Sequence, residues 1–201
     1  MKQVSPLGPN QNLIGKAGGR AALNTPCLVL DLSRMRSNIE RAASFCASNR
    51  IALRPHAKTH KCSQIARMQI AAGAAGVCVA TIGEAEALAS NGIGDILITS
   101  ALTQSGKIER AVLLAKAIRL ALVADDADVV RRIGEAAAQA SVEIPVHVDV
   151  DLGRHRNGVT SINQAIHVAA AIDETRALRL AGLQAYASHI SHVESFAERK
   201  A

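Results

Sequence analysis

The sequence is nearly devoid of aromatic residues: its 201 residues include two phenylalanines, one tyrosine and no tryptophan. Proteins that hold single-stranded nucleic acid stack bases on aromatic side chains, so this class of function is disfavoured. The formal net charge of +6 does not change that conclusion, because lysine and arginine are interspersed with aspartate and glutamate. We therefore expect no nucleic-acid partner, and a core built from alanine, valine, leucine and isoleucine.

Long apolar runs and closely paired cysteines are missing too. No apolar stretch approaches the roughly 18 residues that a membrane span requires, and the first residues lack a signal-peptide core. The four cysteines, Cys27, Cys46, Cys62 and Cys78, include no Cys-x-x-Cys pair, so neither a zinc ribbon nor a redox motif is indicated. We predict a cytoplasmic protein with reduced thiols and no membrane partner.

The composition that remains is globular, with 49% hydrophobic and 20% charged residues. Residues 1–24 are polar and glycine-rich, and we predict that they form a flexible N-terminal arm. Residues 25–201 are predicted to form one domain, in which short β-branched runs alternate with helical patterns. The predicted strands are Cys27–Leu30, Ile51–Arg54, Gly76–Ala80, Asp95–Thr99, Ile118–Ala124, Ile144–Val150 and Leu180–Tyr186.

Four of the intervening helices have a residue that can cap the N-terminus. From Ile51 onward the strands begin every 19 to 36 residues, a spacing typical of βαβ units and therefore of a parallel sheet. The predicted caps and helices are Asp31 for a helix to about Ser48, Thr81 with Glu84 for 85–89, Asp125 for 129–140, and Ser161 for 162–172.

This pattern predicts the α/β class, as a (β/α)8 TIM-type barrel that is incomplete. No Gly-x-Gly-x-x-Gly follows the first strand from Ile51, which argues against a dinucleotide-binding sheet. Six units follow Ile51, whereas a closed barrel has eight strands and about 250 residues. The last residues, 195–201, have a helical pattern without a C-terminal cap, so we expect a truncated version of a longer protein.

The most informative segment runs from Arg54 to Lys61, with the sequence Arg-Pro-His-Ala-Lys-Thr-His-Lys. It follows a predicted strand, and barrel enzymes place catalytic groups at the carboxyl ends of their strands. Cationic neighbours disfavour the protonated form of Lys58, and a neutral amine is what Schiff-base chemistry needs. A solvated basic loop is the alternative, and a metal site that uses His56 and His60 is a less favoured one.

A second segment, residues 145–158, combines a strand with a glycine-bounded turn. Alternation places His147, Asp149 and Asp151 on the face opposite the valines, where they would point into the barrel. An inward row of this kind indicates a functional site, although ion pairs with neighbouring strands would also explain it. Arg154 and Arg156 in the turn could hold a carboxylate or a phenolate by charge-assisted hydrogen bonds.

A third segment, Gly182 to His192, ends the last predicted strand. Gln184 and Tyr186 share one face of that strand, but a single tyrosine is more often a packing residue.

Taken together, these segments resemble the pyridoxal-phosphate-dependent family with an alanine-racemase-type barrel, and most closely its D-threonine aldolase and D-serine dehydratase branch. The resemblance covers about residues 25–192. The segment from Arg54 to Lys61 is specific to this family, whereas the Glu84-Ala85-Glu86 helix is not. The matching residues also include Thr25-Pro26, Val79-Ala80-Thr81, the Val148 to Gly158 turn and Gly182 to Tyr186.

The resemblance assigns roles to particular residues. Lys58 would bind the cofactor covalently and is the expected catalytic residue, with His56 also among the cofactor-binding residues. Arg156 would lie near the phenolic oxygen of the cofactor or the substrate carboxylate, and Gln184 and Tyr186 would line its ring. His192 falls near a further family histidine, but the alignment there is less secure because Ser188 replaces a usual glycine.

The implied activity is that of a carbon–carbon lyase, which cleaves small β-hydroxy-D-amino acids to glycine and an aldehyde. D-Serine dehydratase or racemase chemistry is the alternative within this fold, and a non-catalytic cofactor-holding barrel or gene remnant is the alternative outside it. The family's divalent-metal ligands lie in a C-terminal domain that is absent here. We therefore expect this chain to be inactive alone, and its open sheet edges suggest a homodimer.

Overall fold

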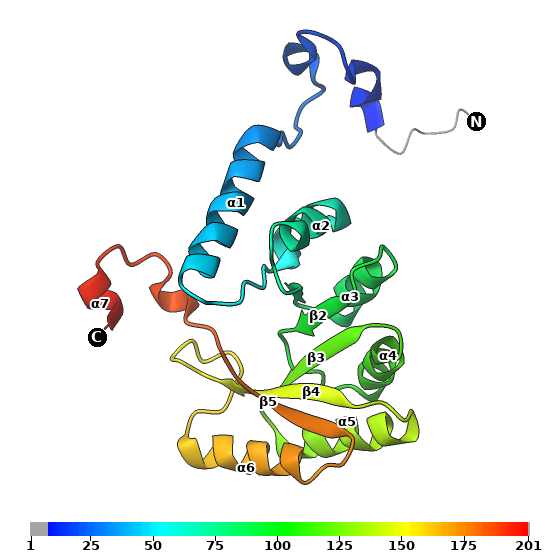
Figure 1. Ribbon diagram of the computed structural model, residues 1–201, viewed down its shortest axis with the longest axis vertical. Coiled ribbons are helices and arrows are strands. Elements are labelled where there is room, and N and C mark those ends of the chain that lie inside the picture. The colour runs from blue at the N-terminus through cyan, green and yellow to red at the C-terminus, as the bar shows by residue number, and fades with distance from the viewer. Residues whose placement is uncertain (1–7, 201) are drawn as a thin grey trace. The chain divides into compact units, whose positions relative to one another are not determined.

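A computed structural model describes residues 8–200 of the chain (Figure 1). The chain divides into two compact units, with the boundary between Asn38 and Ile39. The first unit contains two short 3-10 helices, Gly8–Leu13 and Gly19–Ala22, and the start of helix α1, which spans Leu32–Ser48. The predicted arm lies partly outside the described residues, and its boundary at residue 24 stays a prediction.

The second unit is built on five parallel strands in the order β1-β2-β3-β4-β5. Figure 1 shows helices α3 to α6 following one another along the sheet, one after each strand. The strands are β1 (Val77–Val79), β2 (Asp95–Ile98), β3 (Arg119–Ala124), β4 (Ile144–Val150) and β5 (Leu178–Ala185); the helices are α2 (Ser63–Ala71), α3 (Ile82–Ala89), α4 (Ser105–Ala115), α5 (Ala127–Gln139), α6 (Ile162–Asp173) and α7 (Phe196–Lys200).

This arrangement confirms the predicted incomplete barrel. Strands in sequence order, all parallel and each followed by a helix, are the repeating unit of a (β/α) barrel, and here the sheet does not close. Every buried hydrophobic residue among those described is alanine, valine, isoleucine or leucine, as the composition predicted. In the same part of the chain, no helix is both long and apolar enough to cross a membrane.

Two predicted strands are wrong. Residues 51–55 are irregular, and only His56 forms a bridge, with Cys78 of β1. The segment gives β1 two backbone hydrogen bonds, from Ala75 N to Leu53 O and from Cys78 N to Pro55 O. Pro55 has no N–H to extend the ladder. The described sheet therefore has five strands from Val77 onward, not six from Ile51.

The other wrong strand is residues 27–30, which are irregular and exposed. Their apolar side chains favour a strand, but the first unit, which ends at Asn38, contains no described strand. Within that unit no ladder therefore stabilises an extended conformation at these residues.

Three predicted caps are confirmed and one is wrong. Asp31, Thr81 and Ser161 each accept a hydrogen bond from the backbone N–H three residues later. The cap of α5 is Asp126, which accepts from Val129 N at 2.9 Å, whereas Asp125 bonds elsewhere. Helices α2 and α4 are not among the predicted helices; their N-cap residues, Cys62 and Gln104, make no capping hydrogen bond with their side chains.

Candidate functional site

A cavity of about 340 Å³ opens at the carboxyl ends of the strands. Barrel enzymes place their active sites at this end of the sheet. The volume lies in the range of small-ligand sites. Its lining comes from the turn after His56, the end of β2, the ends of β4 and β5, and the loop after β4, and consists of His56, Lys58, Thr59, Thr99, Asp149, Val150, Arg154, Arg156, Asn157, Gln184, Ala185 and Tyr186.

All five predicted site residues, Lys58, Arg156, Gln184, Tyr186 and His56, line this one cavity. They come from segments up to 130 residues apart in the sequence, numbered 56 to 186. The parallel topology brings them together, because the ends of successive strands lie along one edge of the sheet. The structure thus places these five side chains in one cavity, and their chemical roles stay predictions.

Lys58 is held by a one-turn 3-10 helix, Ala57–Thr59. Ala57 is fully buried in the core, which fixes the turn, while Lys58 faces the cavity. The Lys58 Nζ atom lies 5.7 Å from the centroid of the Tyr186 ring, within the range of a cation–π contact.

His56 lies beneath this turn as a neutral hydrogen-bond donor. Its Nδ1 accepts from Lys58 N at 3.4 Å, so the proton is on Nε2, 3.0 Å from Thr99 Oγ1. The threonine hydroxyl donates in turn to Val79 O at 3.0 Å. Burial, reinforced by the nearby charge of Lys58, lowers the pKa of His56 below its ordinary value.

The cations that the sequence places beside Lys58 are paired with carboxylates. Arg54 contacts Asp95 at 2.6 Å, and the Lys61 ammonium lies 3.6 Å from Glu84. The predicted effect of these neighbours on the protonation of Lys58 stays a prediction.

The cation that shares the Tyr186 ring with Lys58 is Arg156. Its Cζ atom lies 5.7 Å from the ring centroid, the same distance as the Lys58 Nζ atom. The Arg156 Nε–H donates to Asn157 Oδ1 at 2.6 Å. The site therefore presents two positive charges against one aromatic ring, an arrangement suited to an anionic, planar ligand.

Asp149 and Gln184 form the polar wall of the cavity. The two residues are register partners on β4 and β5, and Gln184 Nε2 donates to Asp149 Oδ1 at 2.9 Å and to Thr99 O at 3.3 Å. Burial raises the pKa of Asp149, while hydrogen bonds from Gln184 and Asn157 and the charge of Arg156 act in the opposite direction. The Asp125 carboxylate adds to the increase.

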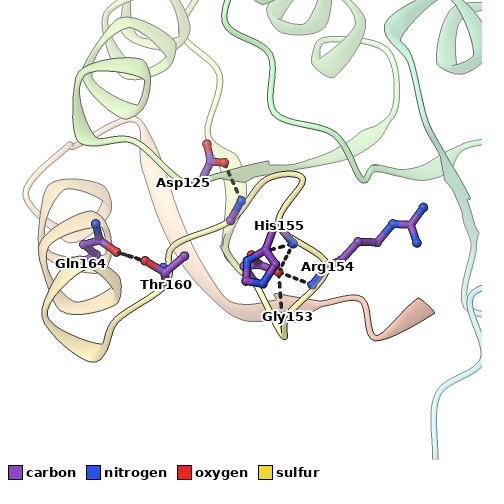
Figure 2. A network of polar contacts seen from close by, with 8 residues as sticks. Asp125, Gly153, Arg154, His155, Thr160 and Gln164 are labelled. Carbon is purple, nitrogen blue, oxygen red and sulfur yellow. Dashed lines mark hydrogen bonds and ion pairs between the residues drawn. The ribbon is translucent and has the colours of Figure 1, made fainter. Parts of the chain in front are cut away.

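The predicted inward row after Pro145 is correct for Asp149 and wrong for Asp151. The Asp151 carboxylate accepts from the backbone N–H groups of Gly153, Arg154 and His155, three residues of its own loop that Figure 2 labels. These bonds lower the pKa of Asp151 against the opposing effect of burial. Asp151 thus shapes the loop that carries Arg156 and does not line the cavity.

The same loop is closed by Gly158, which has a φ of +99°. An added Cβ there would lie 2.6 Å from Asp151 N, so only glycine fits. Its N–H donates to Asp125 Oδ2 at 2.8 Å, also drawn in Figure 2. The turn that presents Arg156 is therefore anchored at both ends by aspartates.

His147 and His192 are not part of the cavity lining. His147 is half-buried beside Gly182, and within residues 8–200 its Nδ1 makes no hydrogen bond. Among residues 8–200, no group of three or more histidine, cysteine, aspartate or glutamate side chains is arranged to hold a metal ion.

Thr99 and Asn157 are site residues that sequence reasoning missed. Thr99 directly follows β2. Its position at the carboxyl end of a strand is the sequence signal that could have identified it as a site residue. Asn157 lies between Arg156 and Gly158 in a loop whose conformation no periodic pattern predicts.

The sequence matches the family described as alanine racemase, N-terminal domain, over residues 30–201. It is 34% identical to a D-threonine aldolase from Arthrobacter sp. over 89% of this chain and 47% of the relative. A 3-hydroxy-D-aspartate aldolase from Paracoccus denitrificans is 33% identical over the same share of each chain. A D-threo-3-hydroxyaspartate dehydratase from Delftia sp. is 33% identical over 68% of this chain and 36% of the relative.

The fold is also similar to that of solved structures. The crystal structure of D-threonine aldolase from Filomicrobium marinum aligns with a TM-score of 0.87 and 38% identity, over 90% of this chain and 49% of that one. This chain spans about half the length of the curated relatives it matches. From the match over most of its length, the chain belongs to the alanine racemase N-terminal domain family.

Proposed function

We propose that these residues form the cofactor-binding half of a pyridoxal-phosphate-dependent lyase of the D-threonine aldolase type. The observation that carries the proposal is the placement of Lys58 and Arg156 against one tyrosine ring, inside a cavity at the carboxyl ends of the strands. The substrate class would be small β-hydroxy-D-amino acids, the compounds after which the aldolase relatives are named.

The cavity fits pyridoxal phosphate in chemistry and size. The cofactor is a planar anion with an aldehyde, and the site supplies a primary amine, a guanidinium and an aromatic face. When bound, the cofactor supplies an electron sink for the bond that breaks at the substrate α-carbon. The residues that would hold it are Lys58, Arg156, Gln184, Tyr186 and His56.

Each of these side chains has a distinct part in this proposal. The Lys58 amine would provide the covalent attachment and release it to an incoming substrate amine. The Arg156 guanidinium would stabilise negative charge by planar, charge-assisted hydrogen bonds. Because both Gln184 Nε2 protons have protein acceptors, its Oε1 would accept a hydrogen bond from a ligand.

Dehydratase chemistry is the second candidate, because the Delftia relative is named a dehydratase. Both reactions begin from the same attachment of a substrate amine, so the residues described here serve either one. The divalent metal of the family, the cytoplasmic location and the homodimer stay predictions from the sequence.

Borohydride trapping tests the proposal. Pyridoxal phosphate added to the chain and reduced in place should yield an adduct that peptide mapping locates on Lys58. The adduct should be lost in Lys58→Ala and kept in Lys61→Ala, the matched control, because Lys61 pairs with Glu84 outside the cavity lining. An adduct located mainly on Lys61 would overturn the assignment.

Product analysis separates the two candidate reactions. With D-threonine and a divalent cation, an aldolase forms glycine and an aldehyde, whereas a dehydratase forms a 2-oxo acid and ammonia. We predict no detectable turnover by the chain alone, because it spans about half of its relatives. Release of glycine would support aldolase chemistry and would refute the predicted inactivity.

A further inference from the structure

Asp149 is the one charged residue that is buried among residues 8–200, with 3% of its surface exposed. A buried carboxylate is costly unless hydrogen bonds satisfy its oxygens. Asp149 lies near the end of β4 and lines the cavity. Its carboxylate accepts hydrogen bonds from two other side chains of the cavity wall, Asn157 and Gln184. These contacts offset part of the cost of burying its charge.

The two carboxylate oxygens of Asp149 serve two different amides. Oδ1 accepts from Gln184 Nε2 at 2.9 Å, and Oδ2 accepts from Asn157 Nδ2. The Asn157 amide continues the chain, because its Oδ1 accepts from Arg156 Nε at 2.6 Å. Asp149 is thus linked to two cavity side chains, directly to Gln184 and through Asn157 to Arg156.

These contacts determine which way each amide points. If the Asn157 amide were flipped, its oxygen would face a carboxylate and its NH₂ would face the Arg156 N–H, and both contacts would be repulsive. If the Gln184 amide were flipped, its oxygen would face both Asp149 Oδ1 and Thr99 O. Only a group with two acceptors at position 149 is compatible with both observed orientations.

We propose that Asp149 is a positioning residue, whose carboxylate fixes the Asn157 and Gln184 amides so that Arg156 is held over Tyr186 and Gln184 Oε1 faces the cavity. The inference rests on the proposed function only for the identity of the ligand, pyridoxal phosphate. The orientation of the three side chains belongs to the protein itself and can be measured without any ligand.

The substitution Asp149→Asn tests this role because it preserves shape and removes one acceptor. The introduced amide has one oxygen and one NH₂ facing two donors, so one neighbouring amide must flip or lose its bond. If Asn157 flips, Arg156 loses its acceptor; if Gln184 flips, its NH₂ replaces its oxygen in the cavity. Either result changes the hydrogen-bonding groups that line the cavity, while the backbone conformation stays the same.

The exchanged pair, Asp149→Asn with Asn157→Asp, is the matched rescue. The amide introduced at 149 can accept from Gln184 and donate to the carboxylate introduced at 157, whose second oxygen accepts from Arg156 Nε. Every donor again faces an acceptor. A role of the Asp149 charge in direct contact with ligand would not be restored by this exchange, whereas a positioning role would be.

The control is Asp125→Asn, which removes a neighbouring negative charge by the same chemical change. The described contact of the Asp125 side chain is one accepted bond, from Gly158 N at 2.8 Å. An asparagine oxygen can accept that bond, so the loop should keep its conformation. This variant separates the loss of charge near the site from the loss of the second acceptor.

Two measurements decide the question on the full chain. Hydrogen exchange of the Arg156 Nε–H, followed by ¹⁵N NMR without ligand, should be about tenfold faster in Asp149→Asn, since the loss of a hydrogen bond donated by a charged group corresponds to about that factor. It should return toward the wild-type rate in the exchanged pair and stay unchanged in Asp125→Asn. Pyridoxal phosphate affinity, measured by absorbance, should follow the same order.

The possible outcomes are distinct. Unchanged Arg156 exchange in Asp149→Asn, or no recovery in the exchanged pair, would overturn the positioning role. If the wild-type chain shows the predicted exchange pattern but no adduct on Lys58, the positioning role is supported and the proposed function fails. If Asp149→Asn does not fold, Asn157→Ala interrupts the same link from the half-buried loop, and wild-type exchange of Arg156 in that variant would refute the proposal.

Discussion

At the scale of single residues, the cavity combines one aromatic ring with two cations and a buried carboxylate. Lys58 and Arg156 are each 5.7 Å from the Tyr186 centroid, and Asp149 reaches Arg156 only through Asn157. The carboxylate therefore does not neutralise the guanidinium by direct pairing. The cavity keeps positive charge available for an anionic ligand, while hydrogen bonds set its direction.

The planar shape of Arg156 should matter as much as its charge. In Arg156→Lys the charge remains, but the Nε–H that donates to Asn157 and the planar fork are lost. Because Arg156 is exposed, stability should change little. Pyridoxal phosphate affinity, measured by absorbance titration, should fall about tenfold or more, the effect of losing one charge-assisted hydrogen bond.

Arg131→Lys provides the control for that substitution. Arg131 pairs with Asp128 and lies outside the cavity lining, so its replacement should leave cofactor affinity unchanged. Equal affinities for Arg156→Lys and wild type would remove Arg156 from the site.

The buried Asp149 should also give stability a specific dependence on pH. Burial raises its pKa above the ordinary 3.8, so the folded state binds more protons than the unfolded state as pH rises through that value. As pH rises from about 3.8 to the raised pKa of Asp149 in the folded state, this contribution lowers the free energy of unfolding. The charges of Asp125 and Arg156 modulate the shift in opposite directions.

Asp149→Asn should remove that contribution. Relative to wild type, the variant should therefore gain stability as pH rises from about 4 toward neutrality, measured by urea unfolding at each pH. Asp31, Asp151 and Glu86 have lowered pKa values and impose the opposite slope on both proteins, so their effect cancels in the difference. A stability difference that is independent of pH would contradict this account of Asp149.

At the scale of the elements, the helices pack closely because small residues lie at their contacts. A Cβ added to Gly134 of α5 would lie 2.1 Å from the Thr175 Cγ2 methyl, just after α6. Thr175 cannot easily turn away, since its hydroxyl donates to Ala171 O at 2.7 Å. Gly134→Ala should therefore destabilise the protein by about 1–3 kcal/mol, typical of overpacking.

Thermal unfolding followed by circular dichroism measures this effect, at about 2–4 °C per kcal/mol for a chain of this size. Gly106→Ala in α4 is the matched control, because nothing lies within 4 Å of the added Cβ. It should leave Tm unchanged or raise it slightly, since alanine is the better helix former. A higher Tm for Gly134→Ala than for wild type would show that α5 and α6 can separate at no cost.

The elements also show what the sequence can and cannot predict. Strand β4 was predicted with its observed bounds, because its alternation and flanking turns are local signals. The strand predicted at 51–54 failed, because pairing depends on a neighbour and on Pro55, which no periodic pattern records. The cap of α5 was missed by one residue, because Asp125 and Asp126 are both suitable and only the structure gives Asp125 to Gly158.

For the site, the residues at strand ends could be predicted from the sequence, whereas the hydrogen bonds between them could not. Lys58, Gln184 and Tyr186 follow from motif and resemblance, and the structure places them in one cavity. The roles of Thr99 and Asn157 depend on hydrogen bonds between segments that are distant in sequence or within an irregular loop. Asp151 was misplaced because alternation was extended past the end of β4, where the loop turns the side chain toward its own backbone.

At the scale of the whole sheet, the two outer strands differ in how they are covered. β1 has the His56 bridge on its outer side, whereas β5 pairs with β4 and, among the described residues, with no other strand. A groove of about 460 Å³ runs beside β5 and α6. Its lining includes Ile162, Ile166 and Leu183, which are 79%, 61% and 69% exposed.

This exposed edge should make the chain self-associate. An unpaired parallel strand beside exposed isoleucine and leucine offers both hydrogen bonds and apolar surface to a second copy. Sedimentation velocity should show a weight-average mass that rises with concentration.

Ile166→Glu and Leu183→Lys should reduce the association while changing stability by less than about 0.5 kcal/mol, since both side chains are exposed. Leu113→Glu, at a 68% exposed position on α4 away from the groove, should leave association unchanged. A monomer at every concentration, or an equal effect of Leu113→Glu, would show that the β5 edge does not drive contact between copies.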